Sequence, residues 1–204
     1  MKYTQLANKE TIDKVMHALR ARNIEPHFVE NKDAALATLK GLIPDGATIM
    51  TGLSQTLEEI GFTALLKSGN HKWINLKDAL LAEKDPVKQL TLRKQSTLAG
   101  YAIGSVHAIT EDGQTLTASG SGSQLPGYAY SSDNVIWVAG AHKIVKDVEE
   151  GLQRIREHSL PLEDKRMKAA GYPGAAIGRI LIFSFEGMPN RKVRIILVNE
   201  ALGF

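Results

Sequence analysis

Cysteine is absent from the 204 residues of the chain, and its absence excludes several kinds of site at once. Without thiols the chain cannot form disulfides, thiolate zinc sites, iron–sulfur clusters of its own or a cysteine nucleophile. Folding without cysteine fits a reducing compartment, so we expect a cytoplasmic protein. No apolar run approaches the ~20 residues of a membrane span, and the first residues lack the apolar core of a signal peptide. We therefore expect no membrane span.

Excess charge of one sign is also scarce. Lys and Arg number 25 and Asp and Glu 22, an excess of three positive charges. Nucleic-acid binding usually needs a concentrated basic patch, so we expect no nucleic-acid partner. The six histidines are dispersed, with no pair at metal-ligand spacing on one helix. We expect no protein-held metal, and a positively charged helix face at Arg154, Arg156, Lys165 and Arg166 is predicted to be solvated.

Apolar spacing predicts alternating helices and strands. Residues 8–23 read as an amphipathic helix that Asn8 can cap, packing on the rest of the chain. Asp85 and Pro86 start another helix, for which Val87, Leu90 and Leu98 are predicted as the core face. Without a linker or an internal repeat, residues 1–204 are predicted to form one α/β domain of three layers. Its sheet is predicted to be mixed and mostly parallel, with a local hairpin.

The first segment that could carry chemistry is TGLSQTLE, residues 51–58. Gly52 lets a ligand approach the backbone, and the hydroxyls of Thr51, Ser54 and Thr56 precede a predicted helix N-terminus, an arrangement that suits anionic oxygens. The segment lacks the lysine of a P-loop and the spacing of GxGxxG. The structural alternative is helix capping by Ser54 or Thr56, and one exposed loop can serve both purposes.

The second segment runs from Gly104 to Gln124. Asp112-Gly113 predicts a hairpin turn, and the return strand then brings a Ser/Gly run back toward Gly104 and Ser105. Because loops at strand ends hold ligands in open α/β sheets, we expect the loops 51–56 and 119–124 to face one cleft. The structural alternative is a surface hairpin with a solvated loop. The candidate ligand-binding residues are Thr51, Gly52, Ser54, Thr56, Gly104, Ser105, Ser119, Gly120, Ser121, Gly122, Ser123 and Gln124.

Three stretches resemble the lactate-utilisation (LUD) domain, once a domain of unknown function. They are PDGATIMTGLSQTLEEIG (44–61), the run from YAIGSVHAITEDGQ to LQRIRE (101–157), and VRIILVNEALGF at the end of the sequence. The resemblance implies a Rossmann-like fold of the sugar-phosphate isomerase and CoA-transferase group. It also implies a part in the oxidation of L-lactate to pyruvate. Where relatives have Glu-Thr-Gly and Ser-Asn-Glu-Gly, this chain has Glu111-Asp-Gly and Ser119-Gly-Ser-Gly.

Three functions remain open at this point. The first is an accessory subunit without a redox cofactor that binds a small anionic metabolite, with an iron–sulfur subunit and a second copy of the chain as candidate partners. The second is an enzyme acting on an acyl-CoA, carboxylate or sugar phosphate, with Glu111 as the catalytic carboxylate, either a base or a nucleophile. Glu111 could instead hold the hairpin closed. The third is an ATP binder resembling folate-cycle ligases, which would need a basic phosphate-binding cluster.

Overall fold

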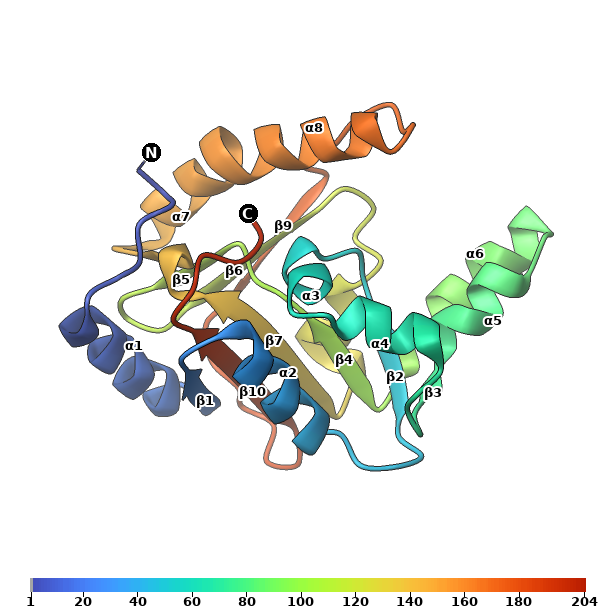
Figure 1. Cartoon of the computed structure of the whole chain (residues 1–204), viewed down its shortest axis with the longest axis horizontal. Helices are drawn as coiled ribbons and strands as arrows, with labels where there is room; N and C mark the ends of the chain where they lie inside the picture. The colour runs from blue at the N-terminus through green and yellow to red at the C-terminus, as the bar shows by residue number, and fades with distance from the viewer. Residues whose placement is uncertain (1) are drawn as a thin grey trace.

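The structure is a computed structural model that describes residues 2–204. The described chain forms two sheets with helices packed around them (Figure 1). The strands are β1 (Ile24–Val29), β2 (Thr48–Thr51), β3 (Ile74–Asn75), β4 (Tyr101–Gly104), β5 (Ala108–Thr110), β6 (Thr115–Ser119), β7 (Asn134–Gly140), β8 (Ile144–Val145), β9 (Arg179–Phe183) and β10 (Lys192–Val198). The α-helices are α1 (Lys9–Ala21), α2 (Lys32–Gly41), α3 (Gln55–Glu59), α4 (Phe62–Ser68), α5 (Leu76–Ala82), α6 (Pro86–Gln95), α7 (Val148–Arg154) and α8 (Leu160–Ala169). Short helical turns are η1 (Ser96–Leu98), η2 (Gly127–Ser131), η3 (Ala141–Lys143) and η4 (Ile155–Ser159).

The larger sheet is parallel throughout and has the strand order β1-β10-β7-β4-β2-β3. Its central strand β7 is buried on both faces, as strands of parallel sheets commonly are. Alternation sends Val135 and Trp137 to one face, where they meet α1. It sends Ile136 and Val138 to the other, against α2, α3 and α4. The mostly parallel α/β architecture expected from the sequence is confirmed.

The smaller sheet has the order β8-β5-β6-β9 and contains the predicted hairpin. Strands β5 and β6 pair antiparallel across a turn in which Gly113 has a φ of +89°. The sequence predicted one mixed sheet, whereas the antiparallel strands form a separate sheet beside the parallel one. Trp137 joins the two, since its ring lies 5.4 Å from that of Phe183 on β9. Burial of apolar surface between the sheets, with α1 at their edge, forms one of the cores.

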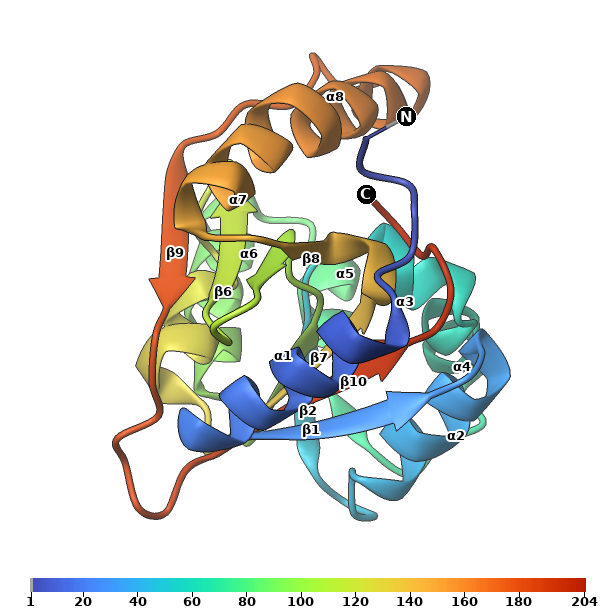
Figure 2. The same cartoon turned by 90° about the vertical axis from the view of Figure 1, so that its left-hand side faces the viewer.

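Side-chain caps begin helices α1, α2 and α6, and those at Asn8 and Asp85 are expected from the sequence. Asn8 accepts from the Thr11 amide at 2.8 Å at the start of α1, and Asn31 accepts from the Ala34 amide at 2.9 Å at the start of α2. Asp85 caps α6 in the same way, with Pro86 in the first turn. Figure 2 shows α1 and β1 on the opposite side of the molecule from α8.

The predicted core face of α6 is wrong. The residues Val87, Leu90 and Leu98 are 73%, 55% and 71% exposed. Helices α5 and α6 pack against each other and project from the end of the parallel sheet at the right of Figure 1, so α6 has no sheet beneath it. Leu81 on α5 is exposed as well. Apolar spacing identified the helix correctly, but it could not tell whether another layer covers that face.

We expect Leu90→Ala and Leu39→Ala to differ sharply in stability, although the side-chain change is the same. Leu39 is fully buried between α2 and the parallel sheet, so its truncation should lower the free energy of unfolding by ~2–5 kcal/mol. Leu90 is half exposed and should lose no more than about 0.5 kcal/mol. Urea unfolding measures the free energy of unfolding of both variants, provided that its slope against urea concentration is the same for each. Equal losses would contradict the placement of α6.

Candidate functional site

A cavity of about 600 Å³ opens at the carboxyl ends of the parallel strands. The loop 51–56, which follows β2, forms one wall, and Ser105, directly after β4, lies on its floor. The opposite wall comes from the smaller sheet, through the end of β6 and the loop 119–124. The prediction that these two loops face one cleft is confirmed. Helices α5 and α6 on one side and α8 on the other border the opening.

Most of the predicted ligand-binding residues line this cavity. They are Thr51, Gly52, Ser54, Thr56, Ser105, Ser119, Gly120, Ser121, Ser123 and Gln124. Gly104 and Gly122 are not among the lining residues. A Cβ at Gly104 would lie 1.7 Å from the hydroxyl of Tyr128, so this glycine lets Tyr128 pack against β4. Gly122 has a φ of +79° and packs against the side chain of Arg179.

Both loops are held by hydrogen bonds of their own. Ser54 accepts from the amide of Leu57 at 3.3 Å, so it caps α3 as the structural alternative predicted, and it still faces the cavity. In the Ser/Gly loop, the Ser119 hydroxyl donates to Gln124 at 2.9 Å and accepts from the amide of Gly122 at 2.9 Å. Capping and cavity lining are thus combined in the same residues.

Lys143 is the central side chain of the floor. It lies in η3 after β7, is 2% exposed and lines the cavity. Its Nζ donates to Thr56 Oγ1 at 3.0 Å and to Ser105 Oγ at 3.1 Å, and these two hydroxyl oxygens lie 3.2 Å apart. Thr56 in turn donates to the Leu202 carbonyl at 3.3 Å. The lysine and the two hydroxyls therefore form a triangle beneath the cavity.

No carboxylate of the described chain pairs with the Lys143 ammonium. Burial, with repulsion from Arg154 as a second cause, lowers the pKa of Lys143 to about 7, while the charge of Glu59 acts in the opposite direction. When a buried cation has only hydroxyls as partners, the free-energy cost of removing it from water is poorly compensated. At neutral pH the amine is therefore present in both its charged and its neutral form.

The other charged groups make the cavity mainly cationic. Lys77 on α5 and Arg93 on α6 line the wall beyond the loop 51–56. Among the described lining residues, Glu163 alone has a carboxylate side chain, and Arg166 holds both of its oxygens at 2.7 Å. His107 also faces the cavity. Burial and then the charges of Lys143 and Arg154 lower its pKa to about 3, so it is neutral at pH 7.

Arg154 lies behind this floor, and the prediction that it is solvated is wrong. It is fully buried, and its Nη1 donates to the Ser159 hydroxyl at 3.0 Å and to the carbonyl of His107. Its Nε and Nη2 have no hydrogen-bond partner among the described residues. The guanidinium carbon is 5.8 Å from the ring centre of Tyr3. Arg154 adds a second buried positive charge without a carboxylate partner, whereas Arg156 and Lys165 are exposed as predicted.

Glu111 lies in the hairpin turn and is not among the residues that line the cavity. Its carboxylate accepts from Lys14 on α1 at 2.6 Å, and its side chain is 33% exposed. The role of Glu111 as a catalytic carboxylate stays a prediction, with no cavity-lining position to support it.

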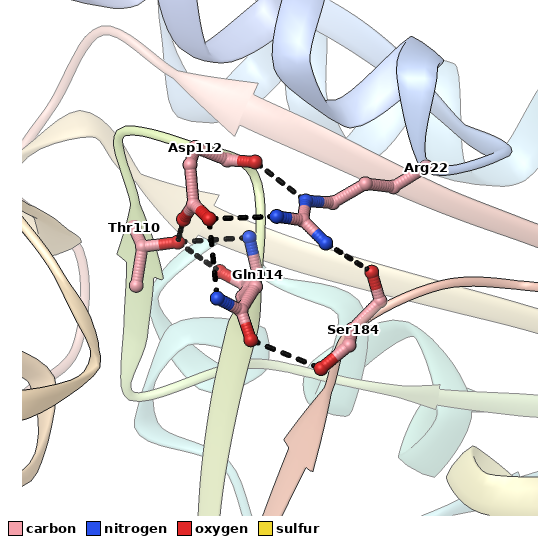
Figure 3. Close-up of polar contacts among 5 residues, drawn as sticks. All are labelled: Arg22, Thr110, Asp112, Gln114 and Ser184. Atoms are coloured by element: carbon pink, nitrogen blue, oxygen red, sulfur yellow. Dashed lines mark hydrogen bonds and ion pairs between the residues drawn. The ribbon is translucent and has the colours of Figure 1, made fainter.

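The neighbouring Asp112 makes the contacts that close the turn (Figure 3). Its carboxylate accepts from the hydroxyl of Thr110 and from Gln114 at 3.2 Å, and Arg22 at the end of α1 reaches it at 2.6 Å. The Thr110 hydrogen bond is the main cause that lowers the pKa of Asp112, with Gln114 and Arg22 acting in the same direction. Arg22 also donates to the carbonyl of Ser184, so it ties α1 to the hairpin and to the segment after β9.

The sequence contained a signal for Lys143 that the motif analysis missed. The stretch VIWVAGAHKIV places one lysine directly after a buried strand and among apolar residues. Because lysine is almost never fully buried without a partner, the apolar residues around it were the one sign in the sequence that this lysine is buried, and a weak one. For Arg154 the signal was weaker, because neighbouring helix positions carry exposed charges.

No described helix is long and apolar enough to cross a membrane. The described residues also contain no cluster of three or more His, Asp or Glu suited to a metal ion.

Fold and site together define an α/β protein with a cationic, hydroxyl-lined cavity at the carboxyl edge of a parallel sheet. The sequence model of the LUD domain matches residues 12–196. Among solved structures, a DUF162 family protein from Deinococcus radiodurans, determined by crystallography at 1.70 Å, is similar. The TM-score is 0.56 and the identity 12%, over 96% of this chain and 100% of that one, which is a likeness of fold. No curated protein matches the chain. The chain belongs to the LUD domain family.

We expect Gly203→Ala to damage the floor of the cavity, and Gly46→Ala serves as its control. Both glycines have positive φ, +68° and +78°. A Cβ at Gly203 would lie 2.3 Å from Thr56 Oγ1 and 3.3 Å from Lys143 Nζ, whereas one at Gly46 meets nothing within 4 Å. Both variants should lose ~1–2 kcal/mol for the left-handed backbone. Thermal unfolding should show a further loss for Gly203→Ala, and equal losses would contradict tight packing there.

Glu111→Gln is expected to leave unchanged the affinity of any anion titrated into the cavity, because the side chain pairs with Lys14 rather than lining the cavity. Ser105→Ala is the contrasting variant, since it removes a hydroxyl that lines the cavity and contacts Lys143. Titration with lactate measures both. A loss of binding on Glu111→Gln with the fold intact would instead support the carboxylate as a working group.

Proposed function

We propose that this LUD domain protein binds a small organic anion in the cavity above Lys143 and acts as an accessory subunit without its own redox centre. Membership of the LUD domain family associates the chain with lactate utilisation in general. The observation that carries the proposal is the Lys143 ammonium, which is buried in a cavity wall with two hydroxyls as its hydrogen-bond partners. An anionic ligand supplies the missing negative charge.

The energetic argument rests on desolvation. Removing an ammonium from water is unfavourable unless an opposite charge or several hydrogen bonds replace the water. In this protein the hydroxyls of Thr56 and Ser105 replace only part of it, and Arg154 adds repulsion. A ligand carboxylate placed against Lys143 would relieve both effects. Binding energy would then come from a charge that the folded chain already holds in place.

The lining supports a carboxylate in particular. Serine and threonine hydroxyls of the two loops can donate to its oxygens, and the cavity carries more positive than negative side chains. Lys77 and Arg93 extend the positive lining toward α5 and α6, so a second anionic group could be held there. The volume of about 600 Å³ lies in the ordinary range for small-molecule sites.

The residue types of the chain support the accessory role in one respect. The 204 residues contain no cysteine, so the iron–sulfur clusters of a lactate-oxidising assembly would lie in another subunit. We propose an iron–sulfur protein as that partner and a cytoplasmic location for the assembly. A second copy of this chain is a further candidate partner.

The affinity for lactate should fall as pH rises above 7. The ligand carboxylate stays ionised over this range, because carboxyl pKa values lie near ~4. Lys143, with a pKa of about 7 in the free protein, loses its proton, whereas His107 and His142, both with pKa about 3, are already neutral. The loss should approach about tenfold per pH unit until the raised pKa of the complex is reached. Isothermal titration from pH 6 to 9 measures it.

The control is Lys143→Met compared with Lys72→Met. Lys143→Met should bind lactate weakly and with no inflection near pH 7, while Lys72, an exposed residue paired with Asp45, should be replaceable without effect. Stability of the ligand-free protein should change in the opposite direction to affinity. The folded-state pKa of Lys143 is lowered, so its deprotonation favours folding as pH rises from 7 toward ~10.4. Binding that is independent of pH in the unchanged protein would contradict the proposal.

A further inference from the structure

The position of the Lys143 amine suits it to act as a nucleophile as well as to bind an anion by its charge. Its side chain is enclosed by the floor of the cavity, so its position is fixed, and it lines the space that a ligand would occupy. No described carboxylate holds it in the ammonium form. Lysines that react with carbonyl compounds share this setting, with desolvation and a neighbouring cation that favour the neutral amine. Here the neighbouring cation is Arg154.

We propose that Lys143 forms an imine with the carbonyl group of a 2-oxo acid bound in the cavity. The inference rests on the proposed anion-binding function, because the carboxylate of the same molecule is what the cationic lining would hold. A 2-oxo acid has its carbonyl carbon directly beside the carboxylate. An amine that lies at the carboxylate site is therefore also within reach of the reacting carbon.

The reaction balances without any oxidant or reductant. The neutral nitrogen attacks the carbonyl carbon, a C–N bond forms, and the π electrons move to oxygen, which takes up a proton. Loss of this hydroxyl as water then breaks the C–O bond and forms the C=N bond. In total, one ammonium and one carbonyl give one protonated imine and one water. The product keeps the positive charge next to the ligand carboxylate.

Two hydroxyls stand where the proton transfers would occur. Ser105 Oγ lies 3.1 Å and Thr56 Oγ1 3.0 Å from the lysine nitrogen, and the two oxygens are 3.2 Å apart. Thr56 donates its own proton to the Leu202 carbonyl, so it is fixed as an acceptor toward the lysine. Ser105 likewise donates to a carbonyl, that of Val106 at 3.3 Å. Ser105 is only partly buried, however, whereas Thr56 is 1% exposed, so the Ser105 hydroxyl is the one that can turn toward the departing oxygen. We assign Ser105 as the proton relay and Thr56 as a positioning residue.

The neutral His107 is consistent with this chemistry. Its Nδ1 accepts from the amide of Ala118 at 3.2 Å, and its low pKa leaves it uncharged at pH 7. It therefore lines the cavity without competing with Lys143 for the carboxylate of the 2-oxo acid. The lining cations Lys77 and Arg93 remain available for a second carboxylate of a longer 2-oxo acid.

Borohydride trapping tests the inference on the unmodified protein. The full chain is incubated at pH 7.5 with pyruvate or with 2-oxoglutarate, reduced, digested and mapped by mass spectrometry. The peptide with Lys143 should carry a reduced adduct, at a yield about a hundredfold above that at the exposed Lys72, because far more of the Lys143 amine is neutral at this pH. Lactate, which has no carbonyl, should give no adduct and should compete with pyruvate. Ser105→Ala should slow adduct formation.

Binding measurements on the same sample separate the two proposals. Where pyruvate and lactate bind by titration but reduction leaves Lys143 unmodified, the imine is excluded and anion binding stands. Where neither compound nor 2-oxoglutarate binds, the anion-binding function fails and the imine with it. Adduct on Lys143 no greater than on Lys72 also excludes the imine, since it would mark ordinary surface chemistry. Mapping of the unmodified chain gives these answers whether or not a Lys143 variant folds.

Discussion

Burial of β7 on both of its faces is the constraint on which the rest of the structure depends. The strand sits in the middle of the parallel sheet, and its side chains join the core shared with α1 on one face and the core under α2 to α4 on the other. Trp137 extends the first core to the second sheet through Phe183. Because β7 cannot slip by one residue without exchanging its two faces, its end is fixed in space.

The end of β7 delivers the most unusual side chain of the protein. Gly140 is followed by one turn of 3₁₀ helix, and Lys143 points from it into the floor of the cavity. Apolar packing of the strand therefore stabilises a buried amine that would otherwise be unfavourable. The segment after β10 closes over this floor, with Leu202 accepting from Thr56 and Gly203 packed against both Thr56 and Lys143. The packing of the core thus fixes the position of the lysine in the site.

The loop 51–56 and the hairpin that ends in the Ser/Gly loop are both rich in hydroxyls and glycine, but they have different structural roles. The loop 51–56 supplies both a helix cap and a cavity wall, and the hairpin 108–119 separates its functions along its length. Its turn is structural, closed by Asp112 and Arg22 (Figure 3). Its far end at Ser119 lines the cavity. The acidic turn thus anchors α1, while the Ser/Gly loop faces the ligand space.

The sequence by itself determined many of the elements and the two polar loops that face each other across the cavity. Caps such as Asn8 and Asp85, the Asp112-Gly113 turn and the continuous apolar run of β7 are local signals, and local chemistry fixes them. Only the tertiary structure decided what covers each element. Val87 and Leu90 have helical spacing but no layer beneath them, and Arg154 is buried where its helix looked solvated. The meeting of Lys143 with Thr56 and Ser105 joins residues from three separate segments, and no spacing along one chain can show such a contact.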